Sequence, residues 1–170
     1  MAQGPRHRTR SRLAAAALAI VCVLASLTSL AAQGSGSEGD VAVVVNADLP
    51  IDNLTLGELR RLVLGDKAFW PGSVRVALLI RAPIAHERDV ILKVVCQMTE
   101  AQFRQHWIAR VFRADNAVAP KIVYSAQSAA ELTAQTPGAI TFIDASQVSK
   151  GMKVVKVDGK LPGEAGYLLR

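Results

Sequence analysis

The sequence predicts an α/β fold in which helices alternate with the strands of a mixed, largely parallel sheet. Val41–Val45 is a continuous apolar run bounded by polar residues, which is typical of a strand buried on both faces. Two capping-box patterns, Thr55 with Glu58 and Thr99 with Gln102, each mark the start of a helix. Strand-like runs come between these helical segments, and such alternation is typical of the α/β class.

The first 31 residues have the pattern of a secretory signal peptide. A basic start, with Arg6, Arg8, Arg10 and Arg12, precedes the almost wholly apolar run Leu13–Leu30. Ser29-Leu30-Ala31 then places small residues in the pattern of a signal-peptidase site. We therefore expect a periplasmic or secreted protein. An uncleaved anchor is the alternative, because the 20 residues of Leu13–Ala32 could also span a bilayer. It is less favoured, because the small residues near the end of this run favour cleavage.

Residues 32–40 are rich in Gly and Ser and predict a flexible tether, followed by one domain over residues 41–170. Cleavage after Ala31 would leave 139 residues (170 minus 31), the usual size of one domain. This part holds all 14 acidic residues and 16 of the 20 Lys and Arg, so its net charge is +2 instead of +6. Such a small excess argues against nucleic acid as a partner.

The segment after the first strand predicts a helix, a turn and a second strand. The helix spans about Leu56–Leu64 and Gly65 ends it. Its buried face is formed by Leu56, Leu59 and Val63. Val74–Arg81 predicts the second strand, and residues 82–85 form a short loop.

The remaining segments alternate in the same way. Helices are predicted over Glu87–Cys96, from Thr99 to about Phe112, and over Ser128–Thr136, where Pro137-Gly138 stops the last one. In the Thr99 helix the apolar face is formed by Phe103, Trp107 and Val111. The extended segments are Ile122–Tyr124, Ala139–Ile143 and Met152–Val157.

Motifs for catalysis and metal binding are sparse. The sequence has no GxSxG, HExxH, CxxC or P-loop pattern. His86 and His106 lie in different predicted helices, and two histidines are too few for a zinc site. Glu87 and Asp89 could form an acid–base pair, but two charges on one exposed helix turn favour a solvated face. Cys96 lies on a predicted apolar face and is expected to be a buried structural thiol. We therefore expect no enzyme, cofactor or metal.

Arg81 is the strongest candidate for a binding residue. It closes an apolar strand, and ligands of open α/β sheets bind beyond the carboxyl ends of the strands. The helix after it would point its N-terminal amides at the same place, where amides and a guanidinium can hold an oxyanion. In the alternative, Arg81 lies in solvent or pairs with Asp66 or Glu87.

Two separated motifs, one over Leu54–Gly72 with the strand that follows and one over residues 130–144, resemble segments of phosphate ABC-transporter substrate-binding proteins. LTLGELRRLVLGDKAFWPG followed by VRVALLIR is similar to that family's "Leu-x-x-Ile-Phe-x-Gly-Lys-x-x-x-Trp" run and its strand ending in Arg. The matching positions are Leu59, Leu62, Val63, Gly65, Lys67 and Trp70. Later, AELTAQTPGAITFID resembles "Val-x-x-x-Pro-Gly-Ala-Ile-Gly-Tyr". There Pro137, Gly138, Ala139 and Ile140 match, while Thr141-Phe142 replaces Gly-Tyr.

The resemblance covers about residues 41–157 and implies a three-layer, periplasmic-binding-protein-like (type II) single lobe. It implies binding of phosphate or a similar small oxyanion, with Arg81 supplying charge and His86 and Arg88 as auxiliary donors. It also implies an ABC transporter or another envelope protein as partner, while a second copy of the chain could cover a ligand that one lobe leaves half exposed.

The sequence departs from that family at the loop after Arg81. The phosphate binders have a Ser-Asp-Gly-Ser-Gly-Thr type loop, whereas this chain has Ala-Pro-Ile-Ala-His-Glu over residues 82–87. The hydroxyls and glycines that grip an anion are missing, and Glu87 would repel one. This departure supports an alternative, a ligand-free scaffold or protein-interaction domain of the cell envelope that retains the binding-protein fold.

Overall fold

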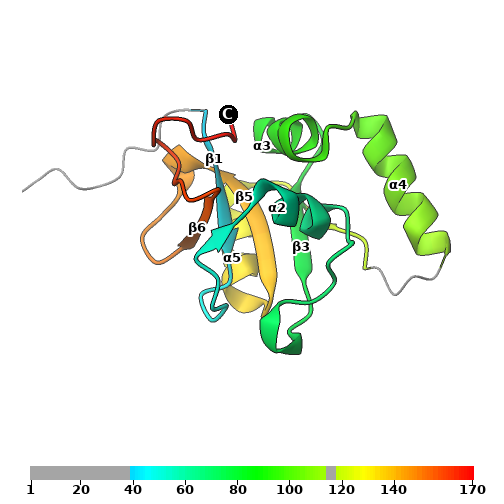
Figure 1. Cartoon of the computed structure of the whole chain (residues 1–170), viewed down its shortest axis with the longest axis horizontal. Helices are drawn as coiled ribbons and strands as arrows, with labels where there is room; N and C mark the ends of the chain where they lie inside the picture. Colours follow the sequence, from blue (N-terminus) through cyan, green and yellow to red (C-terminus); the bar gives the residue numbers. More distant parts are fainter. Residues whose placement is uncertain (1–38, 114–117) are drawn as a thin grey trace, which may run out of the picture. The chain divides into compact units, whose positions relative to one another are not determined.

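The computed structural model describes residues 39–113 and 118–170, so the predicted signal peptide lies outside the described residues. In the described part, six strands form one sheet in the order β2-β6-β1-β5-β3-β4 (Figure 1). They are β1 (Val41–Val45), β2 (Asn53–Leu54), β3 (Ala77–Arg81), β4 (Lys121–Val123), β5 (Ala139–Asp144) and β6 (Lys153–Val157). Three neighbouring pairs are parallel and two are antiparallel, which confirms the predicted mixed sheet.

Helices cover both faces of the sheet and give the three layers that the resemblance implies (Figure 1). One face carries α2 (Leu56–Val63) and α3 (His86–Val90), which continues into the π-helix η3 (Ile91–Cys96). The other face carries α5 (Ala126–Gln135). Beyond η3 lies α4 (Glu100–Phe112). Short 3-10 turns are formed by η2 (Pro71–Ser73) and η4 (Ala145–Gln147).

Strand β1 is buried along its whole length, as predicted, but it is antiparallel to both of its neighbours, β5 and β6. Its side chains alternate between two cores because successive residues of a strand point to opposite faces. Val41, Val43 and Val45 pack under α2 and η3, whereas Ala42 and Val44 pack against the core that contains α5. Its burial therefore comes from helix layers on both faces and not from parallel pairing.

Both predicted capping boxes are present. The Thr55 side chain accepts from the Glu58 amide while the Glu58 carboxylate accepts from the Thr55 amide, and Thr99 with Gln102 does the same at α4. One prediction about α4 is wrong. Val111 is 52% exposed and does not continue the buried face of Phe103 and Trp107. The helix leaves the core at this point, so its last turn presents apolar side chains to solvent.

The predicted second strand starts later than expected, at Ala77 instead of Val74. The preceding residues form a tight turn, in which the Trp70 amide donates to the Val74 carbonyl at 2.8 Å and the Val76 amide donates to the Ala68 carbonyl at 2.9 Å. These bonds use backbone groups that a longer strand would have paired with the sheet.

Asp40, which the sequence assigns to the tether, is part of the fold. Its side chain is 2% exposed, Oδ2 accepts from the Gly163 amide at 2.7 Å, and Oδ1 pairs with Arg170 Nε at 3.0 Å. The Tyr167 hydroxyl donates to the Val41 carbonyl at 2.7 Å. The C-terminal segment therefore fastens the start of β1. Within the described ranges, no helix has the length and apolar character needed to cross a bilayer.

Candidate functional site

Arg81 lies at the carboxyl end of β3, between the ends of β4 and β5, as the sequence predicts. Its side chain turns inward. The guanidinium Nε donates to Glu87 Oε1 at 3.1 Å, and the two side chains are only 13% and 7% exposed. The alternative in which Arg81 pairs with Glu87 is therefore the arrangement that the structure has. The carboxylate of Glu87 occupies the position beside Arg81 that an oxyanion would need.

The loop between β3 and α3 brings Glu87 back over the strand end. The Ala85 amide donates to the Ala82 carbonyl at 3.2 Å, which closes a tight turn. Ile84 at its tip has φ +78° and is fully exposed. A β-branched residue in this left-handed region is strained, and such strain is concentrated at functional sites. The loop therefore presents an apolar side chain where the resemblance implies hydroxyls and glycines.

Arg88 is also buried and paired. Its Nε and Nη2 donate to the two carboxylate oxygens of Glu100 at 2.8 and 2.9 Å, and Nη1 donates to the Arg81 carbonyl at 2.9 Å. The guanidinium also lies 5.4 Å from the centre of the Phe103 ring. This fork joins the end of β3 to the start of α4, because a planar guanidinium matches a carboxylate with two parallel bonds. Arg88 thus serves the fold at this point.

The third predicted residue, His86, faces a different neighbour. Its Nε2 lies 2.9 Å from the Gly39 carbonyl, beside the start of the described chain. His86 and Arg88 both line a cavity of about 630 Å³ along α3 and η3, but Arg81 does not. The structure therefore brings Arg81 and Arg88 together through the Arg81 carbonyl and leaves His86 apart from Arg81.

The charges around the strand end cancel. Arg81 pairs with Glu87, Arg88 pairs with Glu100, and Lys93 pairs with Asp89 at 2.7 Å. Glu87 and Asp89 both lie in the first turn of α3, where they satisfy the helix dipole and oppose a bound anion. One donor is left over, since Arg81 Nη1 is buried with no hydrogen-bond partner among the described residues.

Groups for metal or nucleophilic chemistry are not assembled in the described part of the chain. No cluster of three His, Cys, Asp or Glu side chains that could hold a metal occurs there. Cys96 is fully buried, and burial raises the pKa of its thiol to about 12. A thiol with this pKa stays protonated at neutral pH and is a poor nucleophile.

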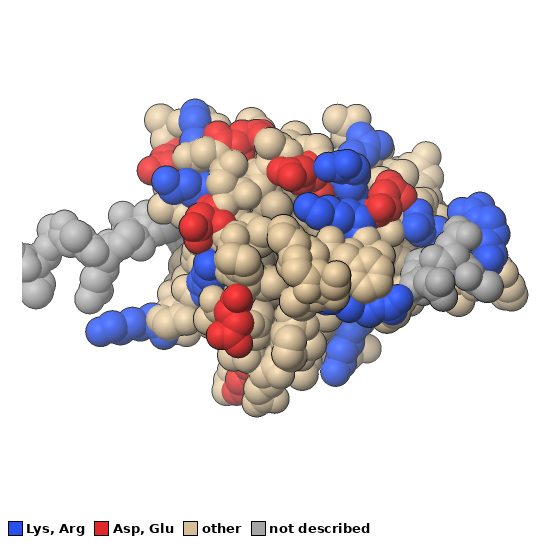
Figure 2. All heavy atoms as spheres, turned by 60° about the horizontal axis from the view of Figure 1, so that its bottom comes forward, with Lys and Arg blue, Asp and Glu red and all other residues tan. Residues whose placement is uncertain are grey.

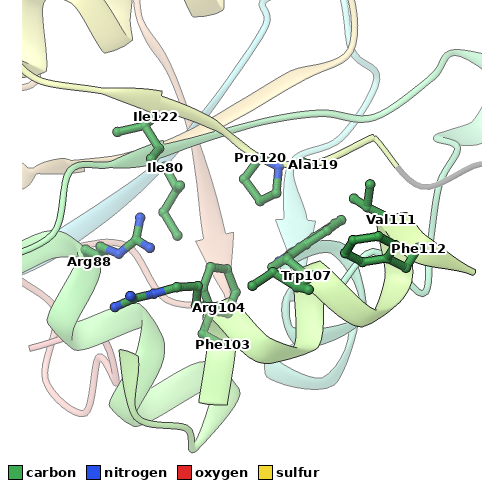
Figure 3. Close-up of a pocket in the computed structure, with 11 residues that line it drawn as sticks. Ile80, Arg88, Phe103, Arg104, Trp107, Val111, Phe112, Ala119, Pro120 and Ile122 are labelled. Atoms are coloured by element: carbon green, nitrogen blue, oxygen red, sulfur yellow. The ribbon is translucent and has the colours of Figure 1, made fainter. Parts of the chain in front are cut away.

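Sequence reasoning missed an apolar groove of about 300 Å³ between α4 and β4 (Figure 3). Its walls include Phe103, Trp107, Val111, Phe112, Pro120 and Ile122. The signal in the sequence is the apolar pair Val111-Phe112 at the end of the predicted helix. The prediction placed Val111 on the apolar face of the helix with Phe103 and Trp107 and gave Phe112 no role.

No protein-family model matches the chain, and a search of curated proteins found no match. Solved structures do match its fold. A protein from Clostridium perfringens, solved with bound phosphate and named as a phosphate ABC transporter substrate-binding protein, aligns at a TM-score of 0.58 and 19% identity. An ABC-type phosphate transport receptor from Vibrio cholerae aligns at 0.58 and 20%, and PstS from Borrelia burgdorferi at 0.57 and 17%.

These alignments cover 74%, 72% and 72% of this chain but only 49%, 48% and 49% of the three structures. The chain therefore spans about half the length of the structures that it resembles. At this identity the likeness shows the fold, a periplasmic-binding-protein-like α/β lobe, as the sequence motifs predict. The first two structures are named as transport proteins and not as enzymes.

Proposed function

We propose that this chain is an exported, periplasmic-binding-protein-like lobe that acts in the cell envelope by contacting a protein partner and not by holding a free anion. The observation that carries this proposal is the buried pair of Arg81 and Glu87. An oxyanion at Arg81 would have to displace the Glu87 carboxylate. Leaving one member of a buried ion pair without its partner costs about 3–5 kcal/mol, which few small-anion contacts would offset.

The loop after Arg81 supports the same proposal. It is closed by its own backbone hydrogen bond and carries the exposed apolar side chain of Ile84. Exposed, strained apolar residues on loops are suited to contact with another protein. The partner that the fold suggests is the membrane part of an ABC transporter or another envelope protein, because two of the matched structures are named for ABC transport. No catalytic role is proposed.

Binding of phosphate or a similar oxyanion at Arg81 is the second candidate, and one specific observation favours it. Arg81 Nη1 is buried without an acceptor, and a buried donor in this state costs about 1–3 kcal/mol. An anion that reached this nitrogen would satisfy it. Because Nη1 is buried, side chains around it would have to move before an anion could reach it.

Thermal unfolding separates the two candidates. The purified protein is melted in phosphate-free buffer, with and without millimolar phosphate or sulfate. The variants Arg81→Ala, Glu87→Ala and Arg81→Ala/Glu87→Ala are melted in the same way. The first candidate predicts no shift for the wild type and a phosphate shift for Glu87→Ala that disappears in the double variant. Ligand at 100 times its dissociation constant adds about 2.7 kcal/mol, an easily measured shift. A phosphate shift in the wild type that is lost in Arg81→Ala would establish anion binding and overturn the first candidate.

A further inference from the structure

We propose that the groove between α4 and β4 binds an amphipathic segment of the partner protein, whose apolar side chains enter the groove and whose acidic side chains meet Arg104. This inference rests on the proposed interaction role and deepens it by naming the surface and the chemistry of the partner. It does not involve Arg81 or the loop that follows it.

The groove has the shape of a site for apolar side chains (Figure 3). One wall is the face of α4 that carries Phe103, Trp107 and Val111, and the other is the chain entering β4 at Pro120 and Ile122. Phe103 and Trp107 form an edge-to-face pair with ring centres 6.4 Å apart, an arrangement that aromatic pairs prefer. A hollow of about 300 Å³ holds a few aliphatic side chains, the size that a helix inserts with its residues at i, i+3 and i+4.

Several of the apolar side chains that line the hollow are also exposed at its rim. Ile108 is 43% exposed, Val111 52%, Phe112 85% and Ile122 43%. Large contiguous apolar patches on a protein surface mark interaction sites. Because Phe112 lines the hollow but is 85% exposed, a small molecule inside would cover only part of its ring, whereas a bound peptide segment would cover the ring together with the rim. A flat membrane surface would cover the exposed side chains but would leave the hollow empty.

Charge at one end of the groove selects an acidic partner. Arg88 and Arg104 lie side by side at this end, opposite Val111 and Phe112 (Figure 3). Arg88 is neutralised by Glu100, but Arg104 is exposed and has no ion-pair or hydrogen-bond partner among the described residues. Among the residues that the structure describes, no acidic side chain lines the groove. In Figure 2, Lys and Arg side chains gather on the right, the side on which Figure 1 places α4.

Two synthetic peptides test this chemistry. Both are helix-forming, about 15 residues long, with leucines on one face. One carries glutamates beside the leucines and the other carries lysines at the same positions. We expect the wild-type protein to bind the acidic peptide and not the basic one. Ile108→Asp should weaken this binding at least tenfold. Arg104→Glu should do the same and should gain affinity for the basic peptide, a swap that a merely structural defect would not produce.

Arg61→Glu is the matched control, because Arg61 is an exposed arginine on α2 that does not line the groove. It should bind the acidic peptide as the wild type does. Equal binding of the acidic peptide by wild type, Arg104→Glu and Ile108→Asp would overturn the inference. So would binding of neither peptide, or binding only to vesicles of anionic phospholipid.

Photo-crosslinking in the host cell separates this inference from the interaction role on which it rests. A crosslinking residue is placed at Ile108 in the groove, at Ile84 in the loop, or at Gln135 on α5. A crosslink from position 108 that the acidic peptide suppresses supports the groove. Crosslinks from position 84 or 135 alone would show that the partner does not bind in the groove, while the proposed interaction role would still hold. Crosslinks from none of the three positions would overturn both.

Discussion

The indole nitrogen of Trp70 donates a buried 2.8 Å hydrogen bond to the carbonyl oxygen of Gly138. The two residues belong to the two sequence motifs that resemble phosphate-binding proteins, and they are 68 positions apart. Gly138 is also in contact with the backbone of Arg75, in the turn that precedes β3. The hydrogen bond therefore joins the turn before β3 to the start of β5 and fixes these two neighbouring strands relative to each other.

Replacing Gly138 tests this junction. Gly138 has φ +76°, and a Cβ there would lie against the carbonyl oxygen of Arg75. We expect Gly138→Ala to lower the free energy of unfolding by about 3 kcal/mol or more, from left-handed strain and from the forced backbone shift. Gly72→Ala is the matched control, because Gly72 has φ +78° but open space around it. It should cost only about 1–2 kcal/mol in denaturant titrations. Equal losses for both variants would contradict the steric argument.

Removing the Glu87 carboxylate should be far more damaging than removing a nearby exposed one. Glu87→Ala leaves the buried Arg81 guanidinium without its partner, and we expect a loss of about 3–5 kcal/mol in phosphate-free buffer. Asp89→Ala removes the exposed partner of Lys93 and should cost less than about 1 kcal/mol. The apolar double variant Arg81→Met/Glu87→Leu should recover most of the loss. If Glu87→Ala were as stable as Asp89→Ala, the ion pair of Arg81 and Glu87 would not stabilise the fold.

The buried thiol predicts how stability changes at high pH. Burial raises the pKa of Cys96 from 9.0 to about 12, because the thiolate is poorly solvated in the core. A raised pKa gives stability that is complete below the unfolded value and is lost as pH rises through the folded value. The loss from Cys96 therefore falls between about pH 9 and pH 12, with a limiting slope of about 1.4 kcal/mol per pH unit.

Cys96→Ala isolates this contribution from other groups that titrate in the same range. Its unfolding free energy should fall less steeply above pH 9 than that of the wild type. At pH 8 the wild-type thiol should react with a thiol reagent only as fast as the protein opens, and denaturant should accelerate the reaction. Rapid labelling of the native protein at pH 8 would show that Cys96 is accessible, against its complete burial.

Much of the fold follows from local sequence signals, but the site does not. The capping boxes at Thr55 and Thr99 and the apolar run Val41–Val45 each act within a few residues, so the sequence shows where these helices and the strand begin. The bond between Arg88 and Glu100 spans 12 positions across η3. The π-helix changes the rotation of the chain relative to an α-helix, and the apolar periodicity of residues 91–96 does not reveal this change.

The sequence could not predict the partner of Arg81 either, because the local pattern does not reveal how the following turn folds. Asp66, Glu87 and solvent were equally compatible with the pattern, and only the turn at Ala82 and Ala85 selects Glu87. Asp66 instead accepts from Arg110 at 2.6 Å. The two-residue strand β2 was not predicted, because Asn53-Leu54 is too short to show any periodicity.

Ile84 tests whether the strained loop is kept for stability or for contact. Its φ of +78° costs a β-branched side chain about 1–3 kcal/mol, whereas glycine adopts this conformation without strain. The side chain is fully exposed, so no packing is lost when it is removed. We therefore expect Ile84→Gly to raise the free energy of unfolding by about 1 kcal/mol, after the extra chain entropy of glycine is subtracted.

The same variant should weaken the proposed partner contact, because the exposed apolar side chain is gone. Ile84→Asn is the matched control for the backbone, since asparagine also tolerates a positive φ but carries a polar side chain. A more stable Ile84→Gly protein with reduced crosslinking from a probe at Ile108 would mean that Ile84 contributes to partner contact at the cost of stability. Unchanged crosslinking in both variants would remove the loop from the interaction surface.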